Sequence, residues 1–247
     1  MKKWFAYGAM FFSLYLIFLI ATIPATWLVS FINLPKNSQV SELTGTVWQS
    51  NAKQLRIDDI EINNVTSELS FLSLLTLDPK VELTFGGALV SGPKGKLTVS
   101  QLLDQLKITD LAINLAARQI SEKLNLAIPV EAHNFVDINI DEFILGKPVC
   151  EQMSGSVQWQ KASITALSDT VNLGSLSADL ACDKGALTFT IAPKNDLGLT
   201  FTAHIRSMKK VSGNGFLKPG ANFPEKIKPV LSFIGKPDNQ GRYRLRF

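Results

Sequence analysis

Two cysteines, Cys150 and Cys182, are the side chains of this 247-residue chain with the greatest potential for chemistry. They stand too far apart for a Cys-x-x-Cys redox motif, and no cluster of histidines and cysteines accompanies them to form a metal site. In a cytosolic protein they would be two separate buried thiols, whereas in an oxidising compartment an even pair is normally bridged. Whether the two cysteines are free thiols or a disulfide therefore depends on the compartment that contains them.

Other candidates for catalysis are few. His133 and His204 are the only histidines, and neither has a second histidine or a cysteine at ligand spacing. Asp58-Asp59 and Asp141-Glu142 are adjacent pairs in strand-like sequence, so the side chains of each pair point to opposite faces and do not form a general acid/base pair. The motifs Gly-x-Ser-x-Gly and His-Glu-x-x-His do not occur. We therefore expect no enzymatic activity, no metal and no cofactor.

A glycine- and lysine-containing segment, residues 91–96, superficially resembles a phosphate-binding loop. Its spacing fails the Gly-x-x-x-x-Gly-Lys-Ser/Thr pattern, because Val90 stands where the first glycine of that pattern would be. Pro93 within it favours a hairpin turn instead. We therefore expect no small-molecule substrate at this segment.

Apolar and polar residues alternate with a period of two over most of residues 42–247, which is typical of half-buried strands. Short connections at 183–185 and 193–196 predict antiparallel neighbours. The alternation in Val65–Phe71 predicts one of the strands, and residues 241–247 predict a closing strand. The expected fold is mainly β with short helices: an antiparallel curved β-sheet or sandwich.

The helical signals lie between residues 100 and 125. Ser100 could cap a short helix over Gln101–Leu106, and Arg118–Leu124 predicts a second short helix before Pro129. Residues 108–115 fit either structure, although the alternation of Leu111, Ile113 and Leu115 suits a strand.

A glycine–tryptophan motif occurs twice. Gly45 and Trp48 lie in Gly-Thr-Val-Trp, and Gly155 and Trp159 lie in Gly-Ser-Val-Gln-Trp, with the glycines 110 positions apart. Glycine permits a bend or a close backbone approach, and tryptophan supplies a large apolar surface. The echo predicts two related β modules, 42–146 and 147–247; alternatively, two similar strand starts arose separately.

A long apolar stretch opens the chain. No charged residue occurs between Trp4 and Pro35, and two lysines precede the stretch. Trp4 and Trp27 are 23 positions apart, which corresponds to roughly 34 Å of helix against a hydrocarbon core of about 30 Å. The two indoles could therefore lie one at each membrane interface. We predict a transmembrane helix over residues 4–32 and a linker over 33–41.

A cleaved signal peptide is the alternative, but its apolar core would be shorter, and a cut after Ala25 would require a small residue where Ile23 stands. The leading lysines predict that residues 1–3 stay in the cytoplasm and that the rest crosses the membrane. In a bacterium this gives a single-pass inner-membrane protein with the bulk of the chain, 42–247, in the periplasm. There we expect Cys150 and Cys182 to be bridged.

The charge distribution is asymmetric. Residues 204–247 contain ten Lys/Arg against Glu225 and Asp238, whereas residues 1–203 contain fifteen against nineteen Asp/Glu. The basic section could contact acidic headgroups or an acidic partner, or it could be a solvated surface that balances the acidic body. Nucleic acid is not expected as a partner, because the section would lie outside the cytoplasm and lacks a module of stacking aromatic residues.

The arrangement of these features resembles the protein N family of the bacterial type II secretion system (the general secretion pathway). The features are one N-terminal anchor, Gly45-Thr46-Val47-Trp48 soon after a proline-containing linker, the later Gly155–Trp159 motif, and two cysteines in the C-terminal half. The resemblance implies an accessory inner-membrane component without known enzymatic activity. Its expected partners are other components of the secretion apparatus and the lipids of the inner membrane.

The glycine–tryptophan strands also look like those of the AsmA-type membrane-anchored β proteins. That second resemblance implies a lipid-handling module in which a curved sheet holds acyl chains. A sheet whose apolar face is fully filled by its own side chains would argue against this alternative.

Overall fold

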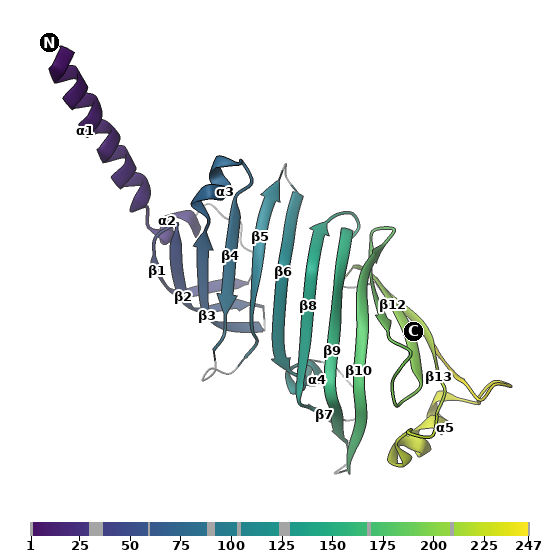
Figure 1. Cartoon of the computed structure of the whole chain (residues 1–247). Helices are drawn as coiled ribbons and strands as arrows, with labels where there is room; N and C mark the ends of the chain where they lie inside the picture. Colours follow the sequence, from purple (N-terminus) through teal and green to yellow (C-terminus); the bar gives the residue numbers. More distant parts are fainter. Residues whose placement is uncertain are drawn as a thin grey trace. The chain divides into compact units, whose positions relative to one another are not determined.

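The computed structural model describes residues 2–29, 37–58, 60–87, 92–102, 105–123, 129–166, 169–207 and 210–246. The chain forms two compact units, residues 1–91 and residues 92–247, and Figure 1 shows their strands and helices. The chain is mainly β, with antiparallel strands in chain order, one 20-residue helix at its start and a few short helices. The mainly β, antiparallel prediction is thereby confirmed. The predicted repeat, with its boundary between residues 146 and 147, stays a prediction.

The first unit contains a meander of four strands that follows the order β1-β2-β3-β4. Two helices precede the sheet and one lies between its last two strands. The elements are α1 (Lys2–Ala21), α2 (Ala25–Val29), β1 (Ser38–Gly45), β2 (Gln49–Ile57), β3 (Ile60–Leu69), α3 (Phe71–Leu75) and β4 (Lys80–Phe85).

The N-terminal apolar stretch does not form one continuous helix. The helix α1 ends at Ala21 and α2 begins at Ala25, directly after Pro24, a residue that cannot supply the amide proton of a helical hydrogen bond. The end of the predicted span, residues 30–32, and the first part of the predicted linker, residues 33–36, lie outside the described residues. Within the described ranges, no helix has both the length and the apolar character needed to traverse a bilayer.

The second unit contains a longer meander in the order β5-β6-β8-β9-β10-β11-β12-β13-β14, and β7 pairs with the far part of β9. Its elements are β5 (Lys94–Leu102), β6 (Gln105–Ala116), α4 (Ala117–Lys123), β7 (Val130–His133), β8 (Phe135–Leu145), β9 (Cys150–Ala166), β10 (Asp169–Asp183), β11 (Ala186–Ile191), β12 (Leu199–Ser207), β13 (Lys210–Leu217), the 3-10 helix η1 (Glu225–Val230), α5 (Leu231–Ile234) and β14 (Tyr243–Arg246).

One of the two predicted helices is wrong. Its described residues lie in strands: Gln101 and Leu102 end β5, Gln105 and Leu106 begin β6, and Gln101 lies opposite Leu106 and Leu102 opposite Gln105. A capped stretch of six residues is too short to form a stable helix without packing, and the alternation that continues through β6 determines the pairing. The helix predicted over Arg118–Leu124 is confirmed as α4, with residue 124 outside the described residues.

A second difference concerns the strand predicted over Val65–Phe71. The strand β3 ends at Leu69, and Phe71 begins the helix α3. The apolar run after Leu69 lacks polar residues at alternate positions, so its sequence does not distinguish a strand from a short helix.

The strands of the second unit present one apolar and one polar face. Residues opposite one another across six strands form an apolar row: Leu111, Ile140, Gly155, Leu180, Phe189 and Ala203. Three positions away along the strands, residues opposite one another form a polar row across five strands: Lys94, Asn114, Asp137, Gln158 and Ser177. This is the alternation from which the strands were predicted.

Two groups of buried side chains cover part of the apolar face. Phe223 and Leu231, from the C-terminal segment, pack against Ala162, Val171 and Leu173 of the sheet. Ala117 of α4 and Ala132 of β7 form a second group with Val136 of β8. Trp159 packs against both groups, so it lies where the two covering segments meet the sheet.

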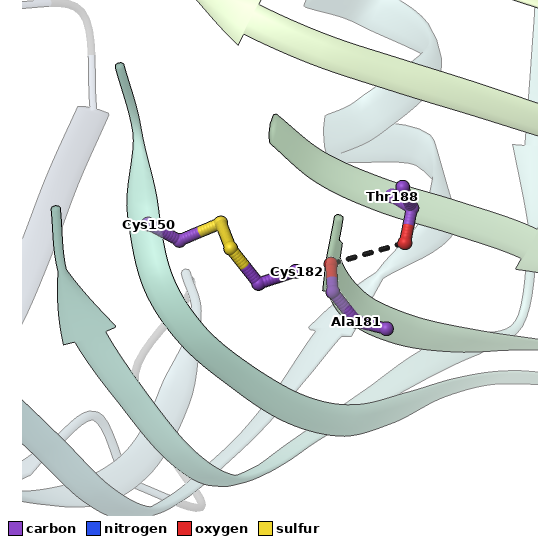
Figure 2. Close-up of a disulfide and its surroundings, with 4 residues drawn as sticks. All are labelled: Cys150, Ala181, Cys182 and Thr188. Carbon is purple, nitrogen blue, oxygen red and sulfur yellow. Dashed lines mark hydrogen bonds between the residues drawn. A yellow bond between two sulfur atoms is a disulfide. The ribbon is translucent and has the colours of Figure 1, made fainter. Parts of the chain in front are cut away.

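The two cysteines form a disulfide, as predicted for an oxidising compartment (Figure 2). Cys150 begins β9 and Cys182 lies near the end of β10, so the bridge closes the open end of a hairpin of 17- and 15-residue strands. Cys150 is 1% exposed. Beside the bridge, Thr188 of β11 donates its hydroxyl to the carbonyl of Ala181 on β10, 3.1 Å away.

Removal of the bridge should destabilise the second unit. The cysteines are 32 positions apart, and the chain-entropy model gives a stabilisation of roughly 3–4 kcal/mol for a loop of this length. We expect Cys150→Ser/Cys182→Ser to lower the Tm of the purified chain by about 10 °C in thermal unfolding followed by circular dichroism. Dithiothreitol should lower the Tm of the wild type similarly and leave that of the double variant unchanged. Equal Tm values for the oxidised wild type and the variant would contradict a stabilising role.

Candidate functional site

The first glycine–tryptophan motif holds the end of the N-terminal helix against the sheet of the first unit. The indole N–H of Trp48 donates to the carbonyl of Ile20, 2.9 Å away, near the end of α1. The amide of Val47 donates to the carbonyl of Ile23, also at 2.9 Å, and Pro24 forms an isolated β-bridge with Thr46. We call residues 45–48 the clamp turn, because Trp48 contacts the end of α1 and Thr46 and Val47 contact the segment that follows it.

Gly45 gives the clamp turn its shape. Its φ is +96°, in the region that side-chain-bearing residues rarely adopt, and a Cβ at this position would lie 2.4 Å from the carbonyl oxygen of Gln49. The amide of Thr46 donates to that same oxygen at 2.9 Å. A side chain at position 45 would therefore push apart the backbone that brings Trp48 to α1.

The two tryptophans predicted to lie at membrane interfaces, Trp4 and Trp27, are both solvent-exposed. Trp4 lies in α1 with 84% of its surface exposed, and Trp27 lies in α2 with 61% exposed. Ala25, beside Trp27 in sequence, is 3% exposed. The segment after α1 is thus held by main-chain hydrogen bonds and one small buried side chain.

The second motif lies in the middle of a strand. A Cβ on Gly155 would lie 2.5 Å from the carbonyl oxygen of Asn139 on β8, so this glycine permits a close approach of two strands. The indole N–H of Trp159 donates to the carbonyl of His133, 2.9 Å away. Both motif tryptophans therefore donate to a backbone carbonyl far away in the sequence, Trp48 to one in α1 and Trp159 to one in β7, although only the first motif lies in a turn.

The structure does not gather the residues considered for catalysis into one site. The imidazole Nε2 of His133 lies 2.7 Å from the hydroxyl of Thr165, whereas His204 lies on β12. The carboxylate of Glu142 pairs with Lys107. Asp59 lies outside the described residues. Among the described residues, no group of three or more His, Cys, Asp or Glu side chains could hold a metal ion.

An open polar hollow of about 510 Å³ lies on the polar row of the second unit. Lys94, Asn114, Asp137 and Gln158 line it, one from each of four adjacent strands. The amide of Asn114 donates to the carboxylate of Asp137 at 2.6 Å, so these two side chains satisfy one another in part. Gly92 and Pro93, from the segment compared with a phosphate loop, precede β5 without entering a helix.

The basic C-terminal section contains an ordered turn at Asp238. Its carboxylate accepts hydrogen bonds from the amide of Arg242 at 3.0 Å and from the guanidinium Nε of Arg242 at 2.9 Å. The backbone hydrogen bond from Arg242, followed by the side-chain one, lowers the pKa of Asp238 below its ordinary value. The guanidinium of Arg242 also lies over the ring of Phe216, 4.4 Å from its centroid.

Comparison with known proteins decides the family. The family model for type II secretion system protein N matches residues 36–246, which include both glycine–tryptophan motifs and both cysteines. The chain belongs to this protein N family. It is therefore a component of a secretion apparatus, as the resemblance in its sequence predicted.

Similar family members cover almost the whole chain. The type II secretion system protein N of Vibrio cholerae is 26% identical over 98% of this chain and 97% of its own length. The protein N of Aeromonas hydrophila is 28% identical over 100% of this chain and 98% of its own. That of Klebsiella pneumoniae is 25% identical over 100% and 96%. No solved structure matches the chain.

Sequence reasoning missed one feature of the first unit. The helix α3 and the turn after it expose five large apolar side chains: Phe71, Leu72, Leu74, Leu75 and Leu77. The ring of Phe71 lies 5.6 Å from that of Trp48 in the clamp turn. The available signal is the uncharged run of residues 69–77, the first three residues of which the alternation assigns to the strand predicted over Val65–Phe71.

Substitution of Gly45 should show how much the clamp turn contributes to stability. We expect Gly45→Ala to destabilise the chain by about 1–3 kcal/mol, because it forces a strained φ and a backbone clash, and to lower the Tm by several degrees. Gly220→Ala is the matched control, since a Cβ there meets nothing within 4 Å. Thermal unfolding of both variants is the measurement. If they unfold alike, the turn does not depend on glycine.

Proposed function

We propose that this chain is an accessory, structural component of the type II secretion apparatus, anchored in the inner membrane, with residues 42–247 in the periplasm. In this role it supports the export of folded proteins across the outer membrane through contacts with other components of the apparatus. The support comes from its family, from the uncharged N-terminal stretch, and from the disulfide, which is typical of an oxidising compartment.

The clamp turn is the observation that carries the anchoring part of the proposal. The side chains of α1 from Tyr7 to Ile20 include many large apolar ones exposed by 41–74%. A helix that is apolar all round is stable where its surroundings are apolar as well. Three contacts from residues 46–48 hold the end of this helix, so whatever phase holds α1 also positions the sheet of the first unit.

Two kinds of surface are available for partners. Among the described strands, β1 pairs only with β2, and β14 pairs only with β13, so each has an open edge that can accept a partner's strand. The strand β14 carries Arg244 and Arg246, for which no acidic partner is found among the described residues. These arginines favour an acidic strand or peptide at that edge.

An exchange of the anchor tests this function. In a deletion strain, we expect a chain whose residues 1–19 are replaced by an unrelated transmembrane segment to restore secretion, since Ile20–Ala25 remain for the clamp turn. A cleavable signal peptide in place of the same residues should leave secreted enzymes accumulating in the periplasm. Enzyme activity in medium and periplasm is the readout. Full secretion with the cleaved chain would contradict the need for an anchor, and unchanged secretion in the deletion strain would contradict the role itself.

A lipid-handling function is the second candidate, and the apolar face of the second unit favours it. Leu111, Ile140, Leu180 and Phe189 remain half-buried, because the two covering groups pack elsewhere on the sheet. Half-buried apolar side chains in a row across four strands can accommodate an acyl chain.

Photocrosslinking distinguishes this candidate. Cells would be supplied with a photoactivatable phospholipid, and the crosslinked peptides of the purified chain would be mapped by mass spectrometry. Lipid handling predicts crosslinks on Leu180 and Phe189 of the apolar row, and none on the polar-row residues Gln158 and Ser177 of the same sheet. Crosslinks confined to residues 1–29 would contradict it and leave only the anchor in contact with lipid.

A further inference from the structure

The exposed side chains of Phe71, Leu72, Leu74, Leu75 and Leu77, which we call the α3 patch, are unusual for a surface of a small β unit. Leu72, Leu75 and Leu77 are exposed by 72, 70 and 84%. No charged residue occurs between Glu68 and Asp78. A contiguous apolar surface of this kind marks a contact with a lipid or protein partner.

The hydroxyl groups of the same segment are hydrogen-bonded to nearby backbone groups. The hydroxyl of Ser73 donates to the carbonyl of Ser70 at 2.6 Å and accepts from the amide of Lys80 at 2.9 Å. The hydroxyl of Thr76 donates to the carbonyl of Ser73 at 2.9 Å. Because these groups are satisfied within the segment, its outer surface can leave water without losing those hydrogen bonds.

Leu77 has no evident role in folding. Its φ is +57°, a conformation that asparagine and glycine adopt far more readily than leucine. Its side chain is 84% exposed, so internal packing does not explain a leucine there either. An apolar residue at a position that disfavours it, and outside the core, points to a contact beyond the chain.

The position of the α3 patch identifies that contact. Trp48 touches Phe71 of the patch and also donates its indole N–H to Ile20 at the end of α1. The patch therefore lies beside the point where the N-terminal helix meets the sheet, at the same end of the unit (Figure 1). If α1 is in the membrane, this is the end of the unit that faces the membrane surface.

We propose that the α3 patch docks into the interfacial layer of the bilayer in which α1 is anchored, so that the first unit contacts the membrane at two points. This inference rests on the anchoring stated under the proposed function. Amphipathic segments bind in this way, with the apolar side chains among the upper acyl chains and the polar groups toward the headgroups.

Site-directed spin labelling tests the docking in the full-length chain. Both native cysteines are in the disulfide, so Leu75→Cys introduces a single thiol for a nitroxide. The control is Ile60→Cys, which replaces a side chain that is 54% exposed at the opposite end of β3. The labelled chains would be reconstituted into vesicles of phosphatidylethanolamine and phosphatidylglycerol, and collisions with oxygen and with a water-soluble nickel chelate would be compared.

Docking predicts that the label at position 75 collides more with oxygen than with the nickel chelate, and that the label at position 60 does the reverse. Nickel accessibility at both positions, in chains that float with the vesicles, would overturn docking and leave the anchor intact. Exclusion of both reagents at position 75 would assign the patch to a second copy of the chain and overturn lipid docking. Chains that do not float would refute the anchor, and docking with it.

A variant of Leu77 separates docking from folding. Leu77→Asn fits the observed φ, so we expect its Tm to equal or exceed that of the wild type while the label at position 75 becomes more accessible to the nickel chelate. A lower Tm would show that the leucine stabilises the fold and would overturn its assignment to a membrane contact.

Discussion

An antiparallel sheet with one apolar face must cover that face, and this requirement determines how residues 92–247 are arranged. No second sheet packs on the described strands of this unit; cover comes from short segments at the side of β9 and β10. Phe223 and Leu231 of the C-terminal segment belong to one covering group, and Ala117 of α4 and Ala132 of β7 belong to the other. Trp159 packs against both groups. The disulfide closes the hairpin of the same two strands. The covering groups pack near the turn of this hairpin, around Ala162 and Val171, and the disulfide closes its opposite, open end.

The first unit meets the same requirement only in part. Of its large apolar side chains, those of α1 and α3 stay exposed, and the connection between α1 and the sheet consists of hydrogen bonds from the clamp turn. Hydrogen bonds fix direction and position well but contribute little net stability in water, about 1 kcal/mol each. This division of roles suits a unit whose apolar surfaces are covered by something outside the chain.

Most strands could be predicted from the sequence because a half-buried sheet imposes a period of two on each of them separately. The apolar row, for example, passes through Leu180 of β10 and Phe189 of β11. In the sequence of each of these strands it appears as an alternation of apolar and polar residues, without knowledge of the pairing. Features that depend on contacts across the chain could not be predicted in this way. The strand conformation of Gln101 and Leu102 is determined by pairing with Gln105 and Leu106 of β6. The carbonyl partners of Trp48 and Trp159 are 28 and 26 positions away. For α3, the polar residues Ser70, Ser73 and Thr76 recur every three positions, but this run is too short for its period to distinguish a helix from a strand.

Magnitudes indicate what a membrane contact at α3 would do. Complete transfer of a leucine or phenylalanine side chain from water to an apolar phase is worth about 1.5–3 kcal/mol. The five side chains of the α3 patch would insert only partly into an interfacial layer, so their sum is of the order of 5 kcal/mol, comparable to a single acyl chain that binds membranes reversibly. Such a contact is too weak to hold the chain in the membrane by itself.

Because Trp48 links the α3 patch to the end of α1, the patch acts on an already tethered unit. There even a weak second contact is favoured by the high effective concentration. The second contact would orient the first unit. A single anchored helix leaves the unit free to rotate about the tether. A second contact restricts that rotation and so determines which strand edges face a partner.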